Sequence, residues 1–87
     1  MIKNVIDAAA TRFLKRYIDT ASPTGFEEKG SSLWLDYIRP YVETTYTDTY
    51  GTAVAVINPS APYKVVIEAR GDEISWFVNY ISPEGLI

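Results

Sequence analysis

The apolar pattern of the chain changes at Pro40, and this change sets the order of its secondary structure. Before Pro40, apolar residues recur at steps of three and four, which is the spacing of one face of an α-helix. After Pro40, apolar and polar residues alternate in short runs bounded by Gly and Pro, which is typical of β-strands. The sequence therefore predicts an α/β fold in which two N-terminal helices pack on a small mixed sheet of about four strands.

The first helix is predicted over about residues 2–19, because Pro23 restricts the residue before it and cannot continue a helix. The second helix follows Thr24-Gly25-Phe26-Glu27, which has the spacing of a capping box in which Thr24 and Glu27 satisfy each other's backbone amides. We expect this helix to run to about Arg39, just before Pro40. Its inward face would consist of apolar residues at helical spacing: Phe26, Leu33, Trp34, Tyr37 and Ile38.

The second half of the chain predicts four strands, at residues 41–47, 52–57, 63–69 and 74–81. The first two would form a hairpin, because Tyr50-Gly51 is a turn signal between them. The third is apolar enough to be a central strand of a sheet.

The third predicted strand ends abruptly in charged residues at Arg70, Asp72 and Glu73. In open α/β sheets, functional groups gather where the carboxyl end of a buried strand meets solvent. Asp72 and Glu73 are therefore the candidate site residues. The alternative is an ordinary strand-end carboxylate paired with Arg70, which Gly71 permits by letting the backbone turn.

The composition excludes several kinds of chemistry. The chain has no Cys and no His, so disulfides, Cys-type zinc sites and imidazole ligands are absent. Its net charge of −3 gives no electrostatic reason to expect nucleic acid or an anionic membrane as partner. No apolar run approaches the roughly 20 residues of a membrane span, and early charges interrupt any signal-peptide pattern. The sequence therefore predicts a soluble cytoplasmic protein.

The order of these elements and motifs resembles the start of the M42 metallo-aminopeptidases, the glutamyl-aminopeptidase and tetrahedral-aminopeptidase relatives also labelled cellulase M. In that family a Ser-Pro-Ser/Thr-Gly-Phe/Tyr-Glu loop precedes the second helix, as residues 22–27 do here. A His-x-Asp-Glu-Ile motif ends the strand that follows the hairpin, at the position of residues 70–74. The resemblance covers essentially all 87 residues, but only about the first quarter of a family member.

The resemblance implies a zinc-exopeptidase-like catalytic domain with two divalent metal ions, Zn or Co. In the family these ions activate a water and polarise the carbonyl of a peptide's N-terminal residue. The motif His is a metal ligand, and the motif Asp orients its imidazole. Asp72 matches the orienting Asp, Glu73 and Ile74 match the pair that follows, and Arg70 stands where the metal-ligand His belongs. Glu73 has no role assigned by the resemblance.

Arg70 removes the ligand chemistry from this position, because a guanidinium carries only donors and stays protonated. The resemblance also places the general-base Glu and the remaining ligands beyond Ile87. We therefore expect no metal to bind this chain, and we expect the chain as written to be inactive as a peptidase.

The resemblance further implies that residues 1–87 are the N-terminal portion of a longer catalytic domain. Leu86 and Ile87 start a new apolar run after a turn at residues 82–85, which favours the same interpretation over a frayed tail on a small complete domain. From about residue 75 the chain would lead into the family's inserted β-rich dimerisation domain. The family implies homo-oligomers, and an uncovered sheet edge predicts self-association of this chain.

Two other functions are open at this point. The first is a non-catalytic interaction module, or pseudo-enzyme remnant, that uses the same fold. The second follows from Arg70-Gly71-Asp72, the tripeptide that integrins recognise on exposed, mobile loops, although the pattern places it here between two predicted strands. A serine nucleophile is excluded, because Ser22 has no His to activate it.

Overall fold

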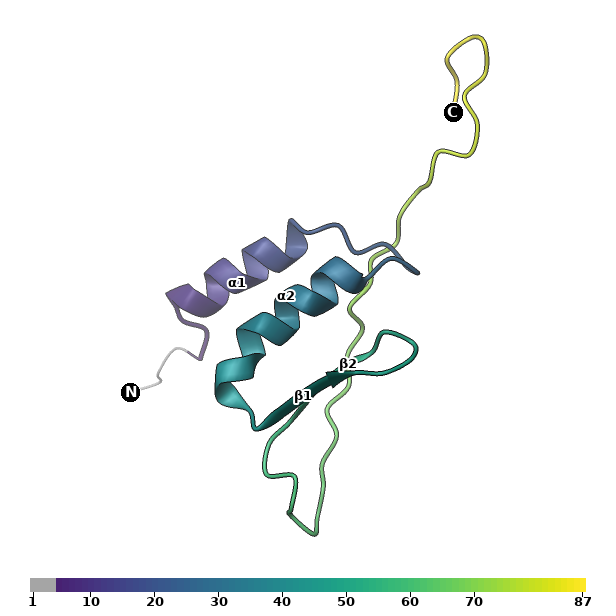
Figure 1. Ribbon diagram of the computed structural model, residues 1–87. Coiled ribbons are helices and arrows are strands. Elements are labelled where there is room, and N and C mark those ends of the chain that lie inside the picture. Colours follow the sequence, from purple (N-terminus) through teal and green to yellow (C-terminus); the bar gives the residue numbers. More distant parts are fainter. Residues whose placement is uncertain (1–4) are drawn as a thin grey trace.

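The computed structural model describes residues 5–87 (Figure 1). Within them lie the helices α1 (Ala8–Ile18) and α2 (Glu28–Ile38), the short 3-10 helix η1 (Arg39–Tyr41), and the strands β1 (Thr44–Thr47) and β2 (Ala53–Val56). Two helices with a small sheet confirm the predicted α/β composition. Over residues 5–87, no helix combines the length and apolar character needed to span a membrane.

Helix α1 begins at Ala8 because Asp7 caps it: Asp7 Oδ1 accepts the Ala10 N–H at 2.8 Å. The sequence predicted a start near Ile2, which lies outside the described residues, and the described residues 5–7 precede the helix. The helix ends at Ile18, with Asp19 as its C-cap and Lys15 paired to Asp19 at 2.9 Å. The predicted end at residue 19 is therefore confirmed to within one residue.

Helix α2 begins at Glu28 without the predicted capping box, which was wrong. Glu27 Oε1 accepts the Gly25 N–H at 2.6 Å, and no side chain caps the helix. The Thr24 hydroxyl instead donates to Asp72 at 2.6 Å. A hydrogen bond to a charged acceptor is strong, and it orients the Thr24 hydroxyl towards Asp72.

The predicted hairpin is confirmed, with shorter strands. Strands β1 and β2 pair antiparallel from Thr44↔Val56 to Thr47↔Ala53. Asp48 Oδ1 accepts the N–H groups of Tyr50 and Thr52, each at 2.9 Å, and so holds the turn. Gly51 has φ +88°, a left-handed conformation that favours glycine.

The predicted strands at residues 63–69 and 74–81 are wrong for the described structure. These segments run along an extended path without a partner strand, and within residues 5–87 the sheet is two-stranded (Figure 1). Residue 73 makes one isolated parallel bridge, to Pro23. A strand is defined by its partner as much as by its sequence, so an alternating apolar pattern alone does not produce a ladder.

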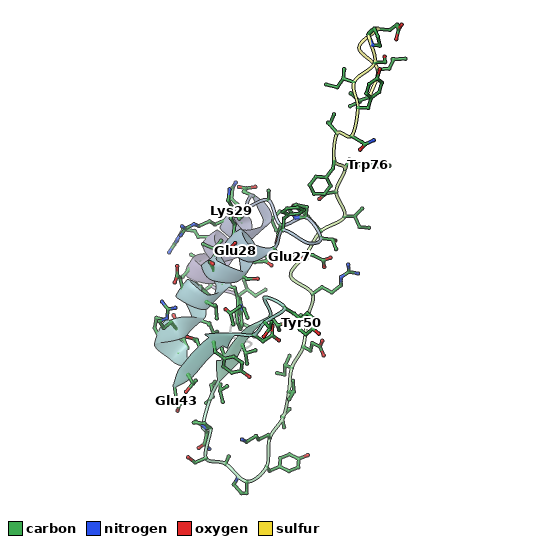
Figure 2. The ribbon with its side chains drawn as sticks, turned by 45° about the vertical axis from the view of Figure 1, so that its right-hand side comes forward. Glu27, Glu28, Lys29, Glu43, Tyr50 and Trp76 are labelled. Atoms are coloured by element: carbon green, nitrogen blue, oxygen red, sulfur yellow. The ribbon has the colours of Figure 1, made fainter. Side chains whose placement is uncertain are left out.

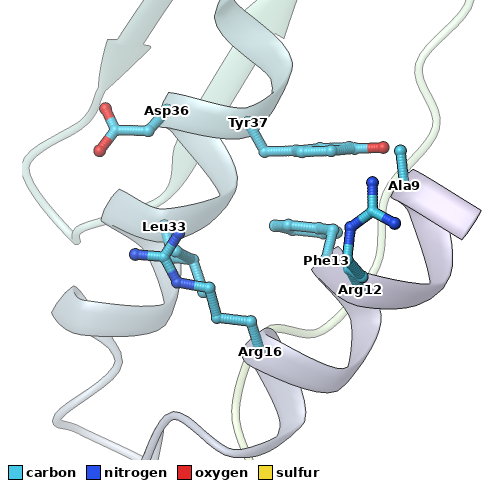
Figure 3. Close-up of a pocket in the computed structure, with 7 residues that line it drawn as sticks. All are labelled: Ala9, Arg12, Phe13, Arg16, Leu33, Asp36 and Tyr37. Atoms are coloured by element: carbon cyan, nitrogen blue, oxygen red, sulfur yellow. The ribbon is translucent and has the colours of Figure 1, made fainter.

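The helices meet through aromatic rings. The rings of Phe13 and Tyr37 stack with centroids 3.9 Å apart, at the hollow between α1 and α2 (Figure 3). Of the predicted inward residues of α2, Leu33, Trp34, Tyr37 and Ile38 are half-buried, whereas Phe26 is exposed and lies against Phe77. No hydrophobic side chain within residues 5–87 is fully buried.

The described chain is elongated. Its radius of gyration is 17.7 Å, with extents of 61 × 38 × 18 Å, against about 12 Å for a compact domain of this length. The C-terminal segment contributes to this length, because it leaves the helices and carries Trp76 into solvent (Figure 2).

Candidate functional site

Two segments about fifty residues apart in the sequence meet at one place, which we call the loop–strand junction: residues 22–24 and residues 71–73. The Glu73 N–H donates to the Ser22 carbonyl at 2.9 Å, and the Thr24 N–H donates to the Glu73 carbonyl at 3.3 Å. Pro23 and Glu73 therefore form a parallel bridge. The junction joins the loop before α2 to the place where the third predicted strand ends.

Ser22 is the buried polar residue of the described chain, with 3% of its surface exposed. Its N–H donates to Glu73 Oε1 at 3.1 Å, and its hydroxyl donates to the Gly71 carbonyl at 2.9 Å. The Tyr17 hydroxyl donates to the same carbonyl at 2.7 Å. Every polar group of Ser22 thus has a partner, as burial requires. Ser22 holds the junction together and is not a nucleophile.

Asp72 is the most heavily hydrogen-bonded carboxylate of the junction. Arg70 Nε donates to Oδ1 at 2.9 Å and Arg70 Nη2 donates to Oδ2 at 3.0 Å, while the Thr24 hydroxyl donates to Oδ2 at 2.6 Å. The hydrogen bonds from Arg70 and then from Thr24 hold the pKa of Asp72 well below its usual range, because they stabilise the charged form. The same pairing raises the pKa of Arg70. The pairing of Asp72 with Arg70, the alternative drawn from the sequence, is confirmed.

The residues at the junction do not fit the metal pair that the resemblance implies. Arg70 places a cation with no lone pair at the ligand position, and its side chain covers both oxygens of Asp72. Glu73, the other carboxylate of the junction, accepts the Ser22 N–H through Oε1. Among residues 5–87, no cluster of three or more His, Cys, Asp or Glu side chains is positioned to hold a metal ion.

Both candidate residues from the sequence lie at the junction, but in different surroundings. The Asp72 side chain is 13% exposed, whereas Glu73 is exposed. Arg70, the partner of Asp72, is 78% exposed. Because Arg70 and Asp72 bind each other, they are not presented as separate groups in the way that an integrin ligand requires. Ile74, which matches the last position of the family motif, is exposed.

The sequence did not predict the hydrogen bonds that three residues make at the junction: Tyr17, Ser22 and Thr24. Tyr17 lies on α1, and its ring lies 6.0 Å from that of Phe13. Its hydroxyl, however, reaches Gly71. The available signal was the hydroxyl itself, since a tyrosine at the edge of an apolar face usually finds a hydrogen-bond partner.

The hollow between α1 and α2 (Figure 3) is lined by no residue of the junction. Its lining mixes apolar and charged side chains from both helices: Ala9, Arg12, Phe13, Arg16, Leu33, Asp36 and Tyr37. Asp36 is already paired with Arg39 at 3.1 Å. This hollow is the groove between two packed helices and offers no chemistry of its own.

Comparison of the chain with protein-family models, with curated proteins and with solved structures gave no match. The family resemblance therefore depends on the motifs of the chain itself.

Proposed function

We propose that this chain forms the N-terminal part of a catalytic domain of the M42 metallo-aminopeptidase type, whose complete form removes N-terminal residues from peptides. The observation that carries the proposal is the loop–strand junction. It brings together the two segments with family-like motifs, residues 22–27 and 70–74. Sites at the carboxyl ends of strands are completed by neighbouring loops, and residues 22–24 lie beside residues 71–73, where the sequence predicts the end of a strand.

The 87-residue chain is proposed to have no peptidase activity of its own. The supporting observation is the double hydrogen bond between Arg70 and Asp72, which occupies the carboxylate that orients a ligand His in the family. We place this protein in the cytoplasm, a proposal supported by a sequence without cysteine.

The gene sequence beyond the codon for Ile87 tests the family assignment. A reading frame that continues in register and adds the missing His, Asp and Glu residues would support it. A natural stop codon directly after Ile87 would contradict it for this protein.

The role of Arg70 is tested by Arg70→His in such a longer chain. We expect the change to raise the zinc or cobalt content measured by mass spectrometry, and to produce hydrolysis of aminoacyl p-nitroanilides. In the 87-residue chain the same change should produce neither effect. Arg39→His is the matched control, because Arg39 is also exposed and paired with an aspartate. Equal metal content in the longer chains with Arg70 and with Arg70→His would show that this position is not the ligand position.

A non-catalytic interaction module is the second candidate function, and the exposure of apolar side chains favours it. Val65, Ile67, Ile74 and Trp76 are each at least 75% exposed, which is typical of surfaces that bind other chains. This function requires the 87 residues to fold into a single defined species without metal. A circular dichroism spectrum of a disordered or aggregating chain would count against it.

A further inference from the structure

The segment from Lys64 to Glu68 is extended and uncovered on both faces. Val65, Val66 and Ile67 are 75%, 84% and 94% exposed. Residues 64–70 make no backbone–backbone hydrogen bond to any other part of residues 5–87. Their N–H and C=O groups are therefore available along both edges, which is the condition under which a strand pairs with another chain.

The sequence of this segment is complementary to itself. Lys64 and Glu68 lie at equal distances on either side of Val66. If two copies pair antiparallel with Val66 opposite Val66, each Lys64 faces the Glu68 of the other copy. Opposite charges directly across a sheet stabilise the pairing, and the intervening Val65 and Ile67 form β-branched cross-strand pairs.

A shift of the pairing by two residues keeps each side chain on the same face of the paired strands, but both such registers are less favourable. A shift of two residues in one direction places Lys64 opposite Arg70 and Val66 opposite Glu68, so that like charges meet. The opposite shift places Glu68 against Pro62, which has no N–H to donate to a ladder. The register centred on Val66 places both charged pairs opposite each other, and each N–H group of residues 64–68 that faces the other copy has a C=O partner.

We propose that two copies of this chain associate through residues 64–68, paired as antiparallel strands about a two-fold axis at Val66. The occupant is a second copy because each copy carries the charge pattern that complements the other, as a symmetric contact requires. This inference goes beyond the proposed function, since residues 64–68 lie outside the loop–strand junction. It concerns the 87-residue chain, because the further strands of a longer catalytic domain would compete with a second copy for the same strand edges.

Charge reversal tests both the partner and the register. Sedimentation velocity over a range of concentrations should show a monomer–dimer equilibrium for the unchanged chain. Lys64→Glu and Glu68→Lys each place like charges at both cross-strand pairs, so each should weaken the dimer about fivefold or more. The double variant Lys64→Glu/Glu68→Lys restores both opposite pairs and should recover the original dissociation constant.

An equimolar mixture of the two single variants provides the sharpest measurement. In a mixed pair every lysine faces a glutamate, so the mixture should form heterodimers about as tightly as the unchanged chain forms homodimers. Lys29→Glu, an exposed change of the same charge on α2, is the control and should leave the equilibrium unchanged. Circular dichroism of each variant checks that the helices are retained.

Three results would overturn the proposal. The first is a monomer at every concentration. The second is equal association of all the variants, which would indicate a contact through the uncharged residues 74–81 instead. The third is a mixture that associates no more tightly than either single variant alone.

Discussion

Asp72 decides how the loop–strand junction responds to pH. Its pKa lies well below the usual carboxyl value of about 3.9 because Arg70 and Thr24 donate hydrogen bonds to its charged form. A carboxyl group with a lowered pKa stabilises the folded state above the ordinary value, and this contribution is lost as the pH falls towards the folded-state value. We therefore expect the junction to stay intact from neutral pH to about pH 4, and to open only on further acidification.

The measurement is a nuclear magnetic resonance titration of the Asp72 carboxyl carbon, read together with the Glu73 amide. Arg70→Gln removes the positive charge and one of the two paired donors, so it should move the Asp72 midpoint up towards the ordinary value and open the junction at a higher pH. Arg39→Gln is the control, because it removes an arginine from a different aspartate. An unchanged Asp72 midpoint in Arg70→Gln would contradict the pairing.

The contacts of single residues were predictable from sequence only where both partners are close along the chain. Arg70 and Asp72 are two residues apart across a glycine, so their pairing was foreseen as an alternative. The partners of Thr24 and Tyr17 lie 48 and 54 residues away. Local spacing suggested a capping box for Thr24, whereas its hydroxyl donates to a charged acceptor 48 residues away, which local spacing cannot indicate.

At the scale of elements, Gly30 connects α2 to the loop–strand junction. It is buried in the helix, and a Cβ at this position would lie 2.8 Å from Ser22 Oγ and 3.4 Å from Tyr17 Cε2. The serine hydroxyl can rotate away, but it then loses its hydrogen bond to the Gly71 carbonyl. Gly30→Ala should therefore gain about 1 kcal/mol of helix propensity and lose about 1 kcal/mol of hydrogen bonding.

The expected signature of Gly30→Ala is an unchanged or slightly higher helix content with faster hydrogen exchange at the Glu73 amide, which donates to Ser22. Circular dichroism and amide exchange measure the two effects separately. Ser32→Ala is the matched control, because Ser32 is exposed on the same helix and its replacement raises helix propensity without a clash. Slow Glu73 exchange in Gly30→Ala would show that Ser22 does not hold the junction.

Elements were predictable where their signals are local. The 3.6-residue period predicted both helices, and Tyr50 with Gly51 predicted the hairpin turn, in which Gly51 has a positive φ. Residues 63–69 and 74–81 have an equally strong strand pattern, but they form no ladder within residues 5–87. Alternation reports that a segment suits a sheet, whereas a ladder also needs a partner strand, and the partner is not encoded in the segment itself.

At the scale of the whole molecule, the described chain divides into a packed part and an extended C-terminal segment. Helices α1 and α2 and the hairpin make most of the contacts between elements. The segment after Ser75 contacts the packed part through Phe77, whose ring lies 5.4 Å from that of Phe26. Its apolar residues are otherwise exposed, among them Trp76 and Val78.

Deletion of residues 76–87 should therefore remove exposed apolar surface without unfolding the packed part. We expect the fluorescence of a hydrophobic dye to fall, because apolar surface binds such dyes. The amide resonances of α1, α2 and the hairpin should keep their positions, and only those near Phe26 should shift, since the Phe26 ring loses its contact with Phe77. Collapse of the helical resonances would instead mean that the C-terminal segment supports the fold. The loop–strand junction alone would then be too weak to hold residues 71–73 against the helices.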